Sequence, residues 1–312
     1  MSWIEPVFTF TLKRLLSAVP TLLLVVAATF FLIRIAPGGP FDSERNLAPD
    51  IRANIERSYH LDEPLLQQFG RYLGGVARGD FGPSYHYRDR DVSDLIAESF
   101  PVSFKLGMTA FFLALLGGVT AGVLAALRRN SFRDHALMSL AMSGISIPNF
   151  VLAPLLVLLF AVHLQWLPAG GWRGLGSIVL PAFTLALPQA AYIARLTRAS
   201  LLDILGSDFL RTARAKGLSR SQAVWRHAMK PTLLPVISYL GPATAALLTG
   251  SVVIEQIFQI PGLGRYFVTG ALNRDYTLVM GVVIFYGSLI IFMNLLVDLL
   301  YAWLDPRTRR KQ

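Results

Sequence analysis

Histidine and cysteine are the side chains best suited to bind a transition metal or to supply a nucleophile, and their distribution supports neither role. The five histidines, His60, His86, His135, His163 and His227, are scattered, with no His-Glu-x-x-His pattern or other paired spacing. The sequence contains no cysteine, which excludes disulfide bonds, thiolate metal sites and cysteine nucleophiles. The sequence therefore predicts no metal site.

Motifs for nucleotide binding and for serine hydrolysis are also missing. The sequence has no Gly-x-x-x-x-Gly-Lys-Ser/Thr loop and no Gly-x-Ser-x-Gly turn. The glycines between Gly170 and Gly176 do not match a dinucleotide fingerprint. We therefore expect no cofactor in this chain, and if ATP drives its activity, another chain must bind ATP and Mg.

Ionisable residues in the middle of a membrane span would indicate an ion-coupled carrier. Lys105, Glu255 and Asp298 all lie near the ends of apolar stretches, where long side chains can reach the interface. A stand-alone carrier is therefore disfavoured. We also weigh a membrane-embedded lipid-modifying enzyme with an arginine-rich loop at the headgroups, but no catalytic acid, base or metal cluster is visible.

The elements that position these residues are apolar helices. Of the 312 residues, 54% are apolar and 15% are charged, and the mean hydropathy is +0.51, which is typical of a chain solvated by lipid. The apolar runs are continuous, which favours helices over a β-barrel. The fold class is an all-α polytopic membrane protein with about six transmembrane helices. We place the spans at Leu15–Ile33, Leu106–Leu127, Ala136–Ala161, Ile178–Ala194, Leu233–Ile254 and Leu278–Val297.

The lysines and arginines near the span ends predict the orientation. They gather before the first span, between the second and third, between the fourth and fifth, and after the last. Residues 36–100 hold eleven Asp or Glu against seven Arg. We therefore expect both termini in the cytoplasm and residues 36–100 outside, and the first span, which lacks an Ala-x-Ala cleavage pattern, to be a retained anchor. This topology accounts for the net charge of +10, so no nucleic-acid partner is expected.

These predictions divide the chain into five parts. Residues 1–14 form a cytoplasmic N-terminus, 15–35 the first anchor, and 36–100 an external loop with short helices at Pro49–Tyr59 and Pro64–Ala77. Residues 101–302 form a five-span core with a cytoplasmic loop at 195–231, and 303–312 form a cytoplasmic tail.

The cytoplasmic loop has the features of two short helices. Ser207 or Asp208 can cap a helix that ends at Gly217 in the left-handed conformation. Ser219 and Gln222 predict a capping box for a second helix, which should stop before Pro231. Such a basic knob fits either a docking element for a protein or a surface that lies on anionic lipid headgroups.

A pair of glycines in the second span predicts close helix packing. Gly118 and Gly122 form a small-xxx-small pattern, which lets two helix backbones approach each other.

Several segments resemble a known family. Arg211-Thr212-Ala213-Arg214-Ala215-Lys216-Gly217 is similar to the EAA motif of ABC importer permeases in the variant typical of peptide and nickel permeases. Only Ala213 and Gly217 match the general motif. The likeness covers nearly the whole chain and includes Arg34–Pro40, Gly79–Ser84, Glu255–Arg265, Leu272–Tyr276 and Asp298–Arg307.

The chain thus resembles the B-type permease subunit of an oligopeptide or dipeptide importer. The resemblance implies a type I importer fold and a location in the bacterial inner membrane. The implied partners are a C-type permease, two ATP-binding subunits that hold ATP and Mg, and an external peptide-binding protein. Arg211 to Gly217 and Ser219 would contact an ATPase subunit. Dipeptides, murein peptides and nickel complexes remain alternative substrates, although the external loop looks like the oligopeptide subgroup.

Overall fold

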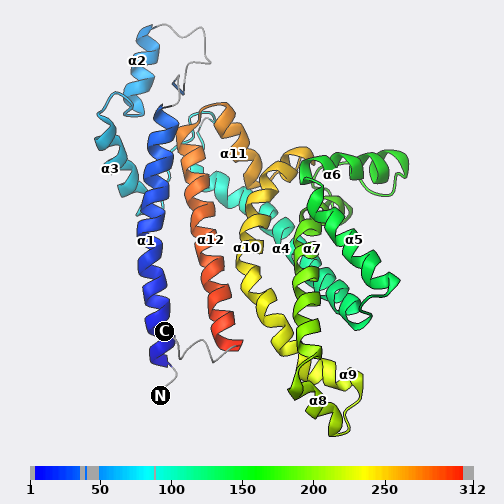
Figure 1. Cartoon of the computed structure of the whole chain (residues 1–312). Coiled ribbons are helices and arrows are strands. Elements are labelled where there is room, and N and C mark those ends of the chain that lie inside the picture. Colours follow the sequence, from blue (N-terminus) through cyan, green and yellow to red (C-terminus); the bar gives the residue numbers. More distant parts are fainter. Residues whose placement is uncertain (1–3, 36–38, 41–48, 88, 305–312) are drawn as a thin grey trace. The chain divides into compact units, whose positions relative to one another are not determined.

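The computed structural model describes residues 4–35, 39–40, 49–87 and 89–304. These residues form helices joined by turns, and within them the only β-type pairing is an isolated bridge between Pro83 and Asp91 (Figure 1). Residues 305–312 of the predicted tail and residues 36–38 and 41–48 of the predicted external loop lie outside the described residues. The all-α prediction is confirmed.

The chain forms two compact units. One, here named the core unit, comprises residues 1–11, 104–260 and 290–312, and the other, named the N-terminal unit, comprises residues 12–103 and 261–289. Three long helices belong partly to each unit: α1 (Ile4–Ile35), α4 (Val92–Leu127) and α12 (Tyr276–Leu304). Each unit is described separately.

Among the described residues, five helices are long and apolar enough to cross a membrane. A sixth span exists if α5 (Phe132–Ser146) and the helical segment after it, Asn149–His163, count as one bent span. The five are Leu16–Ile35 within α1 (Ile4–Ile35), α4 (Val92–Leu127), α7 (Gly176–Leu205), the run Arg220–Ile257 that ends in α10 (Met229–Ile257), and Tyr276–Tyr301 within α12 (Tyr276–Leu304).

The third predicted span, Ala136–Ala161, is formed by two helices with a sharp bend between them, and prolines are the residues expected to kink it. α5 (Phe132–Ser146) ends at Ile147, whose backbone is extended, and α6 (Asn149–Leu156) starts directly after Pro148. The two helices meet at 108°. Proline disfavours helical geometry at the residue before it, which explains the break. α6 then continues as a π-helix, η1 (Val157–His163).

In the core unit, α7 and α10 run side by side (Figure 1), and α4 packs closely against α7 through its glycines. A Cβ atom at Gly118 would stand 2.6 Å from the carbonyl oxygen of Ala190, and one at Gly122 would stand 2.5 Å from that of Ala194. Both distances are shorter than van der Waals contact, so only glycine permits this approach of the two backbones.

An ion pair joins the start of α5 to α7. The Arg198 guanidinium donates from Nε to Oδ1 of Asp134 at 2.6 Å and from Nη2 to Oδ2 at 2.7 Å. The Asp134 side chain is only 1% exposed and also accepts from the backbone N–H of Asn130. This two-pronged contact fixes the turn between α4 and α5 onto α7.

The N-terminal unit contains both predicted external helices, as α2 (Pro49–Ser58) and α3 (Leu65–Val76). It also contains α11 (Leu263–Leu272). Its loop at residues 79–87 is held by the buried Asp275, which accepts hydrogen bonds from the Ser84 hydroxyl and from the backbone N–H groups of His86 and Leu278.

We expect Gly122→Ala to destabilise the protein, because the added methyl group would displace the α7 backbone. Overpacking of this kind costs about 1–3 kcal/mol, which exceeds the roughly 1 kcal/mol that alanine gains over glycine in a helix. Gly117→Ala is the matched control, since a Cβ there meets nothing within 4 Å, and it should be neutral or stabilising. Thermal unfolding in detergent micelles tests both. A Gly122→Ala protein as stable as Gly117→Ala would contradict the packing argument.

Candidate functional site

The segment between α7 and α10 forms the predicted knob, which we define as residues 207–228. Its first helix is α8 (Asp208–Ala215), with Ser207 at the N-cap in extended conformation. The Ser207 hydroxyl donates to the carbonyl of Ile204 at 2.6 Å and makes no capping bond to α8. The cap position was predicted, but its side chain instead ties the knob to the end of α7.

The turn after α8 follows the sequence prediction. Gly217 has φ +93°, a left-handed value that other residues adopt only with strain. The Ser219 hydroxyl accepts from the N–H of Gln222, and the Gln222 side chain accepts from the N–H of Ser219. This capping box starts α9 (Arg220–Ala223) as predicted.

The expectation that the second helix stops before Pro231 is wrong. After α9 the chain continues as a π-helix, η2 (Val224–Ala228), and then directly as α10. In η2 the hydrogen bonds have five-residue spacing, and the N–H of Met229 donates to Val224. Pro231 lies in the first turn of α10, where the hydrogen-bond spacing changes from that of a π-helix to that of an α-helix. The N–H group that proline lacks is not needed at this position. The knob and the span α10 are therefore one continuous element.

A small apolar core anchors the knob to the spans. Leu210, which is 2% exposed, is the buried residue of α8. It belongs to a cluster drawn from α4, α7, α9, η2 and α10, whose other buried members are Val123, Ala126, Leu201, Ala223, Val224, Ala228 and Met229. In addition, Arg220 Nη2 donates to the carbonyl of Leu127 at the end of α4, at 3.2 Å. Movement of the knob is thus mechanically linked to these helices.

The predicted contact residues lie together on α8 and the turn after it, and nearly all are exposed. Arg211, Thr212, Arg214, Ala215, Lys216, Gly217 and Ser219 are exposed, and Ala213 is half-buried. Arg211 pairs with Asp208 at 3.2 Å on the surface, and such exposed pairs contribute little to stability.

Sequence reasoning missed two aromatic residues of the knob. Phe209 is 48% exposed and Trp225 is 64% exposed. Large aromatic side chains that remain exposed among cations are typical of binding surfaces. The sequence signal was a bulky aromatic residue next to a charged one, Phe209 after Asp208 and Trp225 before Arg226.

The exposed side chains of the knob offer groups suited to binding. Within the described residues, no group of three or more His, Asp or Glu side chains could hold a metal ion. The exposed side chains of the knob are mainly cationic, small or aromatic, which suits contact with an acidic or helical surface of another protein.

A polar cluster lies within the spans, between α7 and α10. The Tyr239 hydroxyl donates to Gln189 at 2.7 Å, and the rings of Tyr239 and Tyr192 lie 5.8 Å apart. All three side chains are half-buried. Polar side chains at such positions usually face a cavity or another helix and avoid the lipid.

We expect Leu210→Ala to loosen the knob, because Leu210 is the buried anchor of α8 and truncation of a buried leucine costs about 2–5 kcal/mol. Limited trypsin digestion should then cleave faster at Arg211, Arg214 and Lys216. Phe209→Ala is the control, since that neighbouring side chain is half exposed. Equal cleavage rates in the two variants would show that Leu210 does not anchor the helix.

Comparison with known proteins gives two family matches that together cover most of the chain. Residues 118–310 match the family described as "Binding-protein-dependent transport system inner membrane component". Residues 7–107 match the family described as "Binding-prot-dependent transport system membrane comp, N-term".

Full-length relatives are similar across the whole chain. The oligopeptide transport system permease proteins OppB of Haemophilus influenzae and Escherichia coli are each 54% identical over 302 residues, which is 96% of this chain and 99% of theirs. The dipeptide transport system permease protein DppB of Bacillus subtilis is 47% identical over 96% of this chain and 97% of its own length.

Among solved structures, the inward-facing MetNI methionine ABC transporter shares the fold, with a TM-score of 0.58 at 17% identity. The match covers 68% of this chain and 96% of that one. This similarity identifies the fold as that of a type I ABC importer permease.

Proposed function

We propose, since this chain belongs to the family of inner membrane components of binding-protein-dependent transport systems, that it is the permease subunit of an ATP-driven peptide importer. The two OppB proteins that cover almost the whole chain support this function. The chain is a transporter subunit and not an enzyme.

The observation that carries the proposal is the exposed, firmly anchored knob. We assign Arg211 to Gly217, with Ser219, to contact with an ATP-binding subunit, which would hold ATP and Mg. The exposed Phe209 and Trp225 would fill apolar hollows on that subunit. Because the knob continues into α10 and shares its core with α4 and α7, closure of the ATPase pair would move these spans as a rigid group.

The remaining partners follow from the family. A C-type permease would complete the pathway, two ATP-binding subunits would bind on the cytoplasmic side, and an external binding protein would deliver the peptide. The chain would lie in a bacterial inner membrane with both termini in the cytoplasm. The charge distribution of the loops supports this orientation.

The polar cluster of Gln189, Tyr192 and Tyr239 supports a pathway between the two permeases. Peptides share a backbone but differ in side chains, so a pathway for many peptides needs amide and hydroxyl groups that bind backbone atoms. An apolar lipid-facing surface would not require these residues.

A second substrate class is supported by the dipeptide permease of Bacillus subtilis, which is 47% identical to this chain. Oligopeptides are favoured because the two OppB proteins are more similar, at 54% identity. Uptake by the reconstituted complete transporter, measured with alanine peptides of two to six residues, separates the two. We expect uptake of peptides longer than three residues, and uptake confined to dipeptides would overturn the oligopeptide assignment.

The docking assignment is tested with Gly217→Val. A bulky side chain at this exposed, left-handed position should disturb the contact with the ATPase and reduce uptake per ATP hydrolysed about tenfold or more, which corresponds to roughly 1.4 kcal/mol of coupling. Uptake and ATP hydrolysis are measured together in proteoliposomes.

Gly171→Val provides a matched control, because Gly171 has a similar φ of +87° and equally open space but lies far along the chain from the knob. It introduces the same backbone strain and should leave coupling unchanged. Normal coupling in Gly217→Val, or equal loss in both variants, would refute the docking role.

A further inference from the structure

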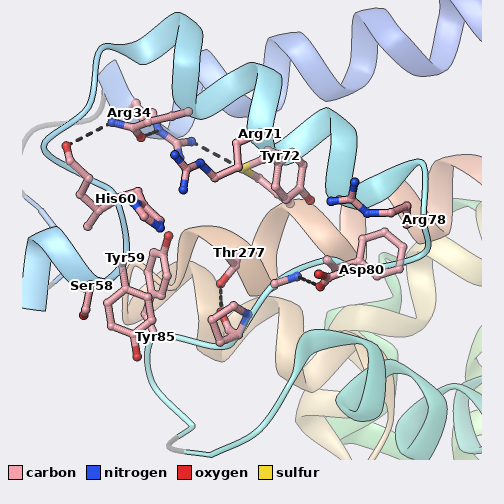
Figure 2. Close-up of a pocket in the computed structure, with 17 residues that line it drawn as sticks. Arg34, Ser58, Tyr59, His60, Arg71, Tyr72, Arg78, Asp80, Tyr85 and Thr277 are labelled. Carbon is pink, nitrogen blue, oxygen red and sulfur yellow. Dashed lines mark hydrogen bonds between the residues drawn. The ribbon is translucent and has the colours of Figure 1, made fainter.

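The N-terminal unit contains a cavity of about 250 Å³ that the coupling mechanism does not use. It lies between the end of α1, α3, the loop at residues 79–85 and the start of α12, with the labelled side chains gathered around it (Figure 2). Two segments that carry the family resemblance border it, through Arg34 and through the loop from Asp80 to Pro83, and Thr277 of α12 lines it as well. Residues far apart in the sequence thus build one site.

The charge of the cavity wall is mainly positive. Arg34, Arg71 and Arg78 line it, and Asp80 is the carboxylate among the lining residues. Arg71 is paired with Glu63 at 2.5 Å, and Asp80 accepts from the N–H of Gly82 at 2.8 Å. These two groups are already engaged.

Arg34 is a half-buried cation without a carboxylate partner among the described residues. Its Nε donates to Gln68 at 3.2 Å, and Nη1 makes only long contacts, to the Phe30 carbonyl at 3.4 Å and to Met280 Sδ at 3.6 Å. The guanidinium lies 3.5 Å from the centre of the Phe30 ring. A desolvated guanidinium gains most from a planar anion that can accept two hydrogen bonds.

The Tyr72 hydroxyl supplies a second donor. The Tyr72 side chain lines the cavity, and its hydroxyl oxygen is buried without a hydrogen-bond partner in the described part of the chain. Burial raises the pKa of Tyr72, and raises that of Tyr85 to about 12, so both phenols are neutral at physiological pH. An unpartnered buried hydroxyl is costly unless a ligand accepts its hydrogen bond.

The cavity is preorganised. Gln68, which is 8% exposed, donates to the carbonyls of Leu61 at 3.1 Å and Glu63 at 2.8 Å, so its oxygen is held toward Arg34. On the opposite wall, the Thr277 hydroxyl donates to the Pro83 carbonyl and fixes the loop to α12. Donors that are already in position bind an anion with little loss of entropy.

We propose that this cavity binds a carboxylate through Arg34 and Tyr72, and that this carboxylate is the C-terminus of a peptide substrate. The second half of the proposal rests on the proposed function. A volume of 250 Å³ is below the range of about 300–1,000 Å³ for whole ligands, so the cavity accommodates the last residue of a longer chain. Phe81 and Met280 provide apolar wall for its side chain.

Calorimetry on the assembled transporter in detergent, without the binding protein, tests this site. The probes are trialanine, trialanine amide, acetate and inorganic phosphate. We expect trialanine to bind and the amide, which lacks the carboxylate, to bind at least tenfold more weakly. Arg34→Gln and Tyr72→Phe should weaken trialanine binding about tenfold and about fivefold. Tyr72→Phe removes only an unpartnered hydroxyl, so it should leave folding intact even if Arg34→Gln does not.

Matched controls are Arg265→Gln and Tyr266→Phe, which change residues of α11 that do not line the cavity and should leave binding unchanged. Equal affinity for trialanine and its amide, or unchanged affinity in Tyr72→Phe, would overturn the proposal. Equal binding of acetate, phosphate and trialanine would overturn the assignment to a peptide terminus.

Peptide uptake by the unmodified transporter is measured in parallel. Its absence would count against the proposed function, whereas normal uptake with unaltered binding in the variants would overturn only the cavity.

Discussion

Hydrocarbon offers no hydrogen-bond partner to a peptide group, and this constraint governs the structure of the membrane-spanning segments. Each apolar stretch must satisfy its backbone internally, so the described residues form helices joined by short turns. Close approach between helices then cannot rely on side-chain hydrophobicity, since lipid is equally apolar. It relies on small residues, as at Gly118 and Gly122, where α4 lies directly on the backbone of α7.

Prolines show how differently this constraint can be met. Pro148 ends α5, because the residue before it adopts an extended conformation and the next helix leaves at 108°. Pro154 lies inside α6, which then widens into the π-helix η1. Pro231 is passed without a break after η2. Proline therefore ends one helix, α5, but is accommodated within two others, α6 and α10. The hydrogen-bond spacing of the surrounding backbone makes the difference.

Charged side chains of this protein lie where they can be paired or hydrated. Three sets of them differ in burial and pairing, and we assign each set a different role. Asp134 and Arg198 form a structural clamp between two helices. The cations of the knob stay exposed and available to another surface. Arg34 is half-buried and lines the same cavity as Tyr72, whose hydroxyl has no partner among the described residues. This arrangement suits the binding of an anion. Burial and pairing, rather than residue type, separate these three roles.

The sequence by itself determined the helical class, most span positions, the left-handed Gly217 and the capping box at Ser219. These features depend on hydropathy over about 20 residues or on contacts within a few residues. The passage of the helix through Pro231 and the exposure of Phe209 and Trp225 were decided by the tertiary structure. So was the cavity, because Arg34, Tyr72 and Thr277 meet only after α1, α3 and α12 have packed together. Local signals fix local geometry, whereas register changes and convergent sites arise from contacts between segments that are distant in sequence.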